Sequence, residues 1–217
     1  MVNARSTSRD SRGYHHGDLR ETLMQTALAS IEAHGTEQLS LRALARAAGV
    51  SATAPYRHFP SKRCLLAALI TRGFQRLEQS VRRASDDAGP DPGERLLAAG
   101  VGYVEFALAN PTLYHLMFST VIEDFSEYAD LQAASEAAYA VVLGIIEDVL
   151  ARPGAPDLPV SEAGGVCWAA VHGVSSLLLF GRDRVQDRGD RSPLTSITLI
   201  ERDPAAVLRR LLEGLID

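Results

Sequence analysis

Apolar residues recur every three or four positions through most of the chain, which is the spacing of one helix face. Four residues of the first such segment share a face: Leu19, Leu23, Ala27 and Ile31. Gly35 follows them as a stop signal. A second apolar stripe over 66–81 predicts a long helix that starts after Ser61 and ends near residue 84. No segment keeps the alternation of a half-buried strand, so the pattern predicts an all-α chain.

Two short helices are expected between the long ones, over about 41–48 and 52–59. Ser40 and Ser51 are favourable N-cap residues for them. Gly49 supplies the left-handed turn between them, and Pro60 ends the second helix because it lacks an amide donor. Two short helices joined in this way, from Ser40 to Phe59, predict a helix-turn-helix, the unit that places its second helix in a DNA major groove.

The rest of the chain is also expected to be helical, after a break in the turn-forming segment 86–93. The expected helices cover about 92–109, 111–118, 126–152, 160–181 and 204–216. Residues 182–203 are rich in Arg, Asp and Ser and are expected to form a long connection.

This reading divides the chain into three parts. We expect a disordered arm over 1–13, because this segment is polar and carries few apolar residues. A helix-turn-helix DNA-binding domain would follow over 14–84, and a helical effector-binding and dimerisation domain over 85–217.

Charge is divided in the same way. Residues 1–83 hold 13 Arg and Lys against 6 Asp and Glu, whereas residues 84–217 hold 9 against 21. The N-terminal segment 1–83, called the head below, is basic, and the C-terminal segment 84–217, the body, is acidic. This division predicts a polyanionic partner for the head alone. Chance variation of charge along the chain is the alternative.

The head carries short polar, aromatic and cationic side chains suited to DNA. The residues expected to bind DNA are Arg42, Ser51, Ala52, Thr53, Tyr56, Arg57, His58, Lys62 and Arg63. Thr53 can contact a base edge or a thymine methyl group. Lys62 and Arg63 can pair with phosphate at a helix N-terminus. A helical pair that packs in a bundle without DNA is the alternative.

Other functional classes find little support in the sequence. No unbroken apolar run reaches the roughly 18 residues of a membrane span, and the polar N-terminus has no signal region, so a cytoplasmic protein with no membrane partner is expected. Cys64 and Cys167 both fall in apolar helical patterns and are expected to be buried thiols, with a disulfide as the alternative. No nucleotide-binding, nucleophile-elbow or zinc-protease motif is present, so we expect neither a catalytic site nor a cofactor nor a metal.

Two segments together resemble the TetR-type bacterial transcriptional regulators: YHHGDLRETLM at 14–24 and LSLRALARAAGVSATAPYRHFPSKRCLLAAL at 39–69. Further along, WAAVHG at 168–173 is similar to the Trp-x-x-x-His-Gly motif of one subgroup of their ligand-binding domains. Pro55 and Arg63 depart from the family pattern, which often has a non-proline residue and an acid at these places. The resemblance implies a homodimer that reads a palindromic operator, with an effector pocket and the dimer interface in the C-terminal domain.

Aromatic and sulfur-containing residues of the body, interspersed with polar groups, suit an apolar pocket with a few polar anchors. The residues expected to bind an effector are Tyr103, Phe106, Tyr114, Met117, Phe118, Trp168, His172 and Ser176. Ordinary core packing is the alternative for each of them, and for His172 a structural hydrogen bond. The apolar load of 160–181 and 204–216 exceeds the need of one small bundle, so both are expected to join a four-helix dimer interface.

The sequence therefore predicts a DNA-binding regulator, by default a repressor, that a small molecule releases from its operator. A sequence-neutral DNA-binding protein is one alternative. A ligand-binding protein or enzyme with a silent DNA-binding head is another.

Overall fold

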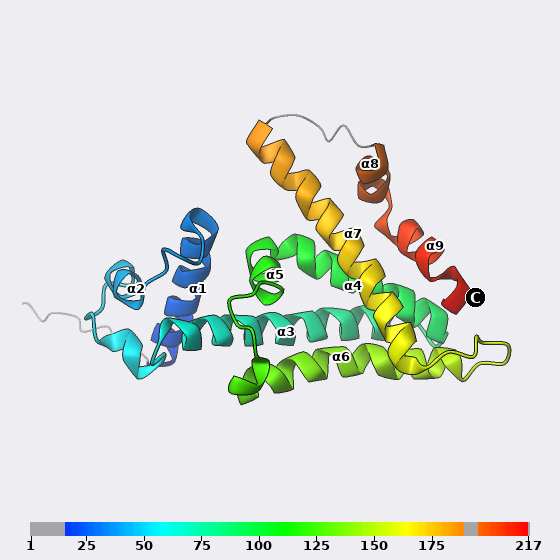
Figure 1. The fold of residues 1–217 in the computed structure, drawn as a ribbon, viewed down its shortest axis with the longest axis horizontal. Coiled ribbons are helices and arrows are strands. Elements are labelled where there is room, and N and C mark those ends of the chain that lie inside the picture. Colours follow the sequence, from blue (N-terminus) through cyan, green and yellow to red (C-terminus); the bar gives the residue numbers. More distant parts are fainter. Residues whose placement is uncertain (1–15, 189–194, 217) are drawn as a thin grey trace, which may run out of the picture. The chain divides into compact units, whose positions relative to one another are not determined.

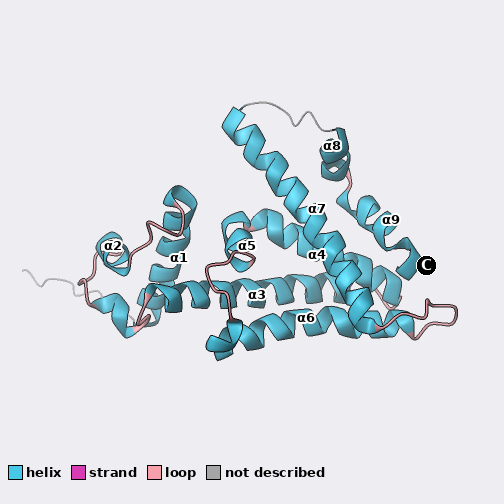
Figure 2. Ribbon diagram, in the orientation of Figure 1, coloured by secondary structure: helices cyan, strands magenta, loops and turns pink. Residues whose placement is uncertain are grey.

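The computed structural model describes residues 16–188 and 195–216. In this part of the chain all regular structure is helical (Figures 1 and 2). The elements are α1 (His16–His34), α2 (Leu41–Ala47), the 3-10 helix η1 (Ala54–Arg57), α3 (Lys62–Asp87), α4 (Pro92–Ala109), α5 (Pro111–Met117), the 3-10 helix η2 (Phe125–Glu127), α6 (Ala129–Leu150), α7 (Val160–Arg188), α8 (Thr195–Arg202) and α9 (Pro204–Ile216). The predicted all-α class is confirmed. The arm expected over 1–13 lies outside the described residues.

Two compact units divide the chain, and the division falls inside α3 between Leu65 and Leu66. The sequence placed this boundary at residue 84 because the helical pattern continues without a break to that point. Beyond Leu66, however, α3 packs on the C-terminal helices. The Ser80 hydroxyl donates a hydrogen bond to the Gly102 carbonyl of α4 at 2.9 Å.

The N-terminal unit encloses a small core of its own. Apolar side chains from α1, α2 and the segment after η1 are buried in it: Leu23, Met24, Ala27, Leu41, Leu44 and Phe59. Ser40 caps α2, since its hydroxyl accepts the Ala43 amide at 3.1 Å. Gly49 has a φ of 68°, as the turn between the two short helices requires.

The second short helix differs from the expectation. Instead of an α-helix over 52–59, the chain forms a 3-10 helix of four residues, Ala54–Arg57. Pro55 is the physical reason, because it has no amide hydrogen to donate to the carbonyl four residues earlier. The Ala54 amide donates to the Ser51 carbonyl at 3.0 Å, and the His58 amide donates to the Pro55 carbonyl at 3.0 Å.

In the C-terminal unit α4 is the central helix, in contact with α6, α7 and α9 (Figure 1). Asp91 caps it by accepting the Glu94 amide at 2.9 Å. The connection expected over 182–203 is wrong in part, since α7 continues to Arg188 and α8 covers Thr195–Arg202. Arg and Gln are good helix formers, and the polar composition of this segment concealed that propensity. Within this unit Ile197 and Ile200 of α8 are buried.

Helix α7 is long and apolar enough over 160–182 to cross a bilayer by length and composition, although no unbroken apolar run of that length exists. In the most apolar 18-residue stretch of this helix, 44% is buried against the rest of the structure. It packs on α4, α6 and α9, as the core helix of a bundle does. Its apolar residues therefore serve helix packing on one side, and the other side remains exposed.

Candidate DNA-binding surface and ligand cavity

Most residues expected to bind DNA are exposed on the N-terminal unit. Arg42, Thr53, Tyr56, Arg57 and Arg63 are exposed, and Tyr56 retains 44% of its accessible surface. Ser51 and Ala52 are also exposed, and the Ser51 and Thr53 hydroxyls lie 3.3 Å apart. The 3-10 geometry repeats every three residues, so Thr53 and Tyr56 lie on one face of the turn. That face combines a hydroxyl, a methyl group and a phenol, which suit base edges and phosphates.

Lys62 and His58 are half-buried instead. The Lys62 ammonium donates to the Glu37 carbonyl at 3.1 Å, so it joins the start of α3 to the segment between α1 and α2. The sequence could not indicate this contact, because the two residues are 25 positions apart. Arg46, exposed near the end of α2, adds a cation on the same unit as Arg42.

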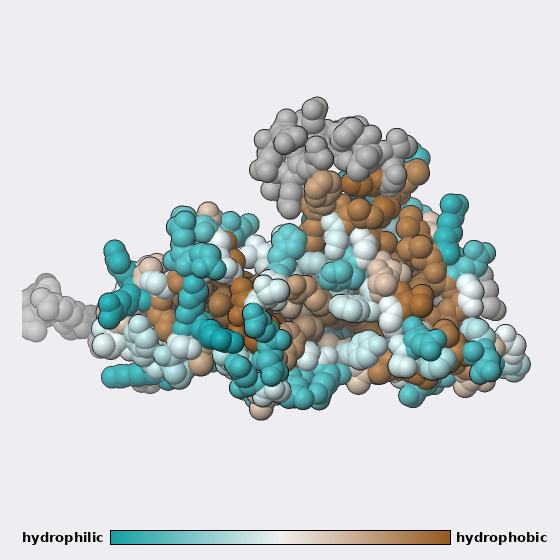
Figure 3. Space-filling view, in the orientation of Figure 1, coloured by the Kyte–Doolittle hydropathy of each residue, from teal (hydrophilic) through white to brown (hydrophobic). Residues whose placement is uncertain are grey.

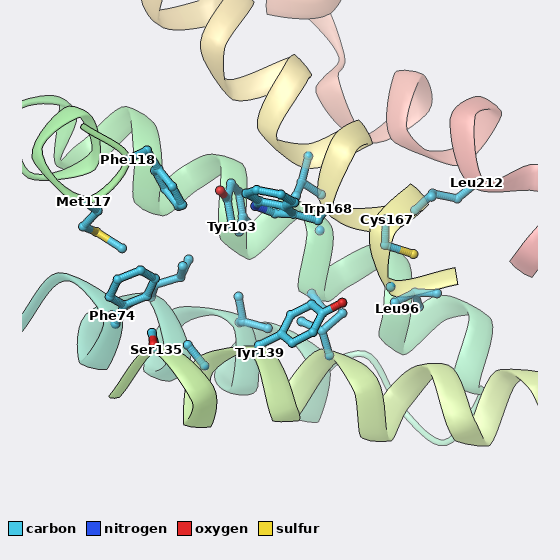
Figure 4. Close-up of a pocket in the computed structure, with 18 of the residues that line it drawn as sticks. Phe74, Leu96, Tyr103, Met117, Phe118, Ser135, Tyr139, Cys167, Trp168 and Leu212 are labelled. Atoms are coloured by element: carbon cyan, nitrogen blue, oxygen red, sulfur yellow. The ribbon is translucent and has the colours of Figure 1, made fainter. Parts of the chain in front are cut away.

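The C-terminal unit contains a cavity of about 490 Å³, the size of a site for a small molecule (Figure 4). Residues of α3, α4, α5, η2, α6, α7 and α9 line it. Its wall is almost entirely apolar, and among the described residues that line it none is Asp, Glu, Lys, Arg or His. The polar lining groups are the hydroxyls of Tyr103, Ser135 and Tyr139, the indole N–H of Trp168 and the thiol of Cys167.

Four of the residues expected to bind an effector line this cavity: Tyr103, Met117, Phe118 and Trp168. Phe106, Tyr114, His172 and Ser176 are not among the lining residues. Phe106 is buried in the core, and Ser176 is exposed on α7. Tyr114 and His172 lie directly behind Tyr103.

Two further helices, α3 and α6, line the cavity with residues that were not predicted from the sequence. From α3 come Phe74, Leu77 and Val81, and from α6 come Ser135, Ala138, Tyr139 and Val142. Each of these residues follows an ordinary amphipathic pattern, which does not distinguish a cavity wall from a packed core. The aromatic residue Phe74 was the available signal, and its ring meets those of Phe118 at 6.1 Å and Phe125 at 5.8 Å.

Three polar side chains from three helices meet behind the cavity wall. The Tyr114 hydroxyl of α5 lies 2.8 Å from Nδ1 of His172 in α7. The Tyr103 hydroxyl of α4 is 3.4 Å from the Tyr114 hydroxyl and 3.3 Å from the same Nδ1. The rings of Phe118 and Trp168 enclose His172, with centroids at 4.8 and 5.6 Å. The structural hydrogen bond expected as the alternative role of His172 is therefore present.

Burial controls the protonation of these groups. It raises the pKa of Tyr103 and of Tyr114 above the ordinary value of a phenol. It lowers the pKa of His172, which favours the neutral imidazole. Burial also raises the pKa of the Cys167 thiol to about 11, so Cys167 is a poor nucleophile. Burial thus favours the uncharged forms of Tyr103, Tyr114, His172 and Cys167.

Tyr139 and Trp168 are at once lining residues and partly exposed, with 43% and 51% of their surfaces accessible. They come from α6 and α7, and in Figure 4 they lie on opposite sides of the cavity. The two helices approach closely at Gly164. A Cβ atom placed there would lie 2.6 Å from the Tyr139 hydroxyl and 2.9 Å from Leu143. The absence of a side chain at 164 therefore sets the position of Tyr139.

Cys64 and Cys167 are free thiols; Cys167 is buried as expected, whereas Cys64 is only half-buried. Among the described residues, no group of three His, Cys, Asp or Glu side chains is placed to hold a metal ion.

Two family models match the chain. Residues 23–69 match the bacterial regulatory proteins of the TetR family, and residues 96–197 match the tetracycline repressor-like C-terminal domain. The Trp-x-x-x-His-Gly subgroup stays a prediction.

Individual proteins agree with these matches. The chain is 27% identical to the HTH-type transcriptional regulator Rv1816 of Mycobacterium tuberculosis over 186 residues, covering 72% of this chain and 80% of the relative. It is 31% identical over 144 residues to the HTH-type transcriptional repressor KstR of the same organism, covering 66% and 61%.

Solved structures share the fold. A Rhodococcus protein of unknown function superposes with a TM-score of 0.72 at 28% identity, covering 95% of this chain and all of that one. The TetR family regulator PfmR of Thermus thermophilus superposes with a TM-score of 0.59 at 18% identity, covering 86% and 97%. With a helix-turn-helix in one unit and a helical bundle around a cavity in the other, the chain belongs to the TetR family of bacterial transcriptional regulators.

Proposed function

We propose that this regulator is a homodimeric repressor that a small molecule releases from a palindromic operator. The observation that carries the proposal is the 490 Å³ apolar cavity in the C-terminal unit of a chain whose N-terminal unit is a helix-turn-helix. A cavity of this size and apolar lining suits a small organic molecule. Binding would remove apolar surface of both the ligand and the wall from water, which is favourable.

On the DNA side, the exposed Thr53 and Tyr56 would face the major groove, and Arg42, Arg57 and Arg63 would approach phosphates. Two such units must stand about 34–36 Å apart to meet successive major grooves. A dimer with twofold symmetry supplies that spacing for a palindromic site.

The dimer interface would form on the exposed sides of α7 and α9. Several large apolar side chains are exposed there: Val166, Leu177 and Phe180 of α7 and Leu211 of α9. Figure 3 shows hydrophobic surface over the part of the C-terminal unit that α7–α9 occupy. On α7, Gly165 and Gly173 have open space where a Cβ atom would be, so the backbone of a second helix can approach closely. Other apolar residues of the two segments expected at this interface, such as Val174 and Leu208, are buried within the subunit.

Sedimentation velocity tests this interface. The unmodified protein is expected to sediment as a dimer, and Leu177→Glu together with Leu211→Glu is expected to give monomers with unchanged helical circular dichroism. Thr198→Glu, at an exposed polar position, is the matched control. An unmodified chain that sediments as a monomer at micromolar concentration contradicts the dimer.

The switch would act through α3. This helix begins at Lys62, directly after the helix-turn-helix, and its residues Phe74, Leu77 and Val81 line the cavity. A ligand that displaces α3 would change the spacing of the two DNA-binding units and weaken operator binding.

The decisive experiment selects bound sequences from random DNA and then titrates the complex with candidate ligands. A selected palindrome bound at least about a thousandfold more tightly than random DNA at fixed salt supports a specific regulator. Equal affinities favour the sequence-neutral DNA-binding protein. A saturating ligand that leaves operator affinity unchanged contradicts the switch, and turnover of the bound compound would favour an enzyme with a silent head.

A further inference from the structure

The cavity wall restricts the chemical class of its ligand. We propose that the effector is an uncharged, largely hydrocarbon molecule with one oxygen function, and that the Tyr103 hydroxyl binds this oxygen. The inference rests on the proposed ligand-sensing function and adds to it the class of ligand and the residue that anchors it.

The first step is the absence of charge among the lining residues. A buried carboxylate, sulfonate or phosphate needs a cation or several donors in place of its water shell. The wall offers hydroxyls, one indole N–H and a thiol, but no Arg or Lys side chain. The described lining residues also include no Asp or Glu, so no carboxylate is available to pair with a cationic ligand. An ionic group held inside the cavity, away from its partly exposed edge at Tyr139 and Trp168, would lose its hydration without an ionic partner.

The second step is the geometry behind Tyr103. In either neutral tautomer Nδ1 of His172 offers one hydrogen-bonding site, and the Tyr114 hydroxyl occupies it at 2.8 Å. The Tyr103 hydroxyl donates to the Tyr114 hydroxyl at 3.4 Å and lies 3.3 Å from Nδ1 of His172, and the Trp168 side chain is a further hydrogen-bond partner. Both distances are longer than the roughly 2.7–2.8 Å usual between such groups. Of Tyr103, Tyr114 and His172, only Tyr103 lines the cavity, so a ligand oxygen can replace these long contacts with a shorter bond.

The protonation of the Tyr103 hydroxyl determines which ligand groups it can bind. The Tyr103 hydroxyl remains protonated near neutral pH, since burial raises its pKa. It can donate to a carbonyl oxygen, or both donate to and accept from a hydroxyl. The remaining wall consists of aromatic and aliphatic side chains, among them Phe74, Phe118 and Leu96, which contact hydrocarbon (Figure 4).

Four naphthalene derivatives of similar size test the charge requirement. The neutral ketone 2-acetylnaphthalene, the hydrocarbon 2-ethylnaphthalene, the anion 2-naphthoate and the cation 2-naphthylmethylammonium are titrated into the full-length protein by calorimetry at about pH 7.5. The ketone is expected to bind most tightly and the hydrocarbon roughly three- to tenfold more weakly, the effect of one net hydrogen bond. Both ions are expected to bind at least roughly a hundredfold more weakly than the ketone. An ion that binds as tightly as the ketone, or a ketone that does not bind, overturns the proposal.

Two pairs of variants test whether the ligand binds in this cavity and beside Tyr103. Tyr103→Phe should reduce the affinity for the ketone to that for the hydrocarbon, whereas Tyr128→Phe, outside the cavity wall, should not. Val142→Phe should weaken both neutral ligands, whereas Val141→Phe, the neighbouring residue outside this wall, should not. Trp168, the single tryptophan, reports binding through quenching of its fluorescence. An unchanged ketone affinity in Tyr103→Phe overturns the anchor.

Because these titrations use no DNA, their outcome is separate from that of the switch. Neutral ligands that bind without releasing the operator would contradict the proposed function and leave the ligand class intact. An acidic or cationic compound that binds the cavity and releases the operator would contradict the ligand class and support the function.

Discussion

The Tyr114 hydroxyl and Nδ1 of His172, 58 positions apart in the sequence, are joined by a 2.8 Å hydrogen bond. This contact links α5 to α7 at the back of the cavity. Met117 and Phe118, which follow Tyr114 closely in the chain, line the cavity. The hydrogen bond that holds α5 against α7 therefore also supports these two lining residues, although neither of its partners lines the cavity.

Removal of the Tyr114 hydroxyl should lower stability. In Tyr114→Phe the ring remains, but Nδ1 of His172 loses its short hydrogen bond, so we expect the free energy of unfolding to fall by about 1 kcal/mol. Guanidinium denaturation measures this change, and Tyr128→Phe is the control. A loss as large in the control as in Tyr114→Phe would show that the hydrogen bond is not the cause.

The protonation of His172 should make stability depend on pH. Burial lowers the pKa of His172 in the folded chain below the ordinary value of about 6.5. As the pH falls below about 6.5 the unfolded chain takes up this proton more readily than the folded one. The contribution of His172 to stability is therefore present above about pH 6.5 and is lost as the pH falls toward the folded pKa.

Histidine NMR titration measures this pKa directly. Between about pH 7 and 5.5, His172→Gln should lose less stability than the unmodified protein. A resonance of His172 that titrates at or above about pH 6.5 would contradict the prediction.

The packing of α4 against α3 should not tolerate a side chain at Gly102. A Cβ atom at this position would lie 2.9 Å from both the Ser80 carbonyl oxygen and the Ala84 Cβ. The backbone carbonyl cannot move aside easily, so Gly102→Ala should cost about 1–3 kcal/mol of stability. Gly144→Ala is a matched helical control with open space around it and should gain about 0.5–1 kcal/mol. Equal thermal shifts in the two variants would refute this reading of the contact.

In the DNA-binding unit, two variants should separate recognition from folding. Tyr56→Ala removes an exposed ring and should weaken operator binding roughly tenfold with little change in stability. Lys62→Ala removes the hydrogen bond to the Glu37 carbonyl and should also lower stability by about 1 kcal/mol. Fluorescence anisotropy with operator DNA and thermal unfolding measure the two effects. Should Tyr56→Ala unfold the unit, Tyr56 is structural.

Periodicity predicted most of the fold because the helices end at residues with strong local preferences. Pro92, Pro111 and Pro204 each start a helix, and Ser40 caps another, as their chemistry dictates. The 3-10 course at Pro55 and the helical course of 182–188 and 195–202 were not predicted. In the first case one absent amide hydrogen changed the local geometry, and in the second a polar composition concealed a helical propensity.

The cavity was harder to predict than the fold. Trp168 and Tyr103 were predicted as lining residues because aromatic side chains interspersed with polar groups are typical of ligand pockets. Ala138 and Val142 follow the same apolar pattern as residues of a packed core. A lining role depends on which side chains fail to meet across three or more helices. That property belongs to the packing, and helical spacing in one segment does not report it.

Gly164 makes the shape of the cavity wall sensitive to a single mutation. The hydroxyl of Tyr139 occupies the space that a methyl group at 164 would need, and Leu143 lies 2.9 Å from the same point. One nucleotide change in a glycine codon yields alanine or valine, and either would have to displace Tyr139 or Leu143 where α6 and α7 approach each other. Evolution can thus remodel the lining at Tyr139 through one codon while every codon of the helix-turn-helix stays the same.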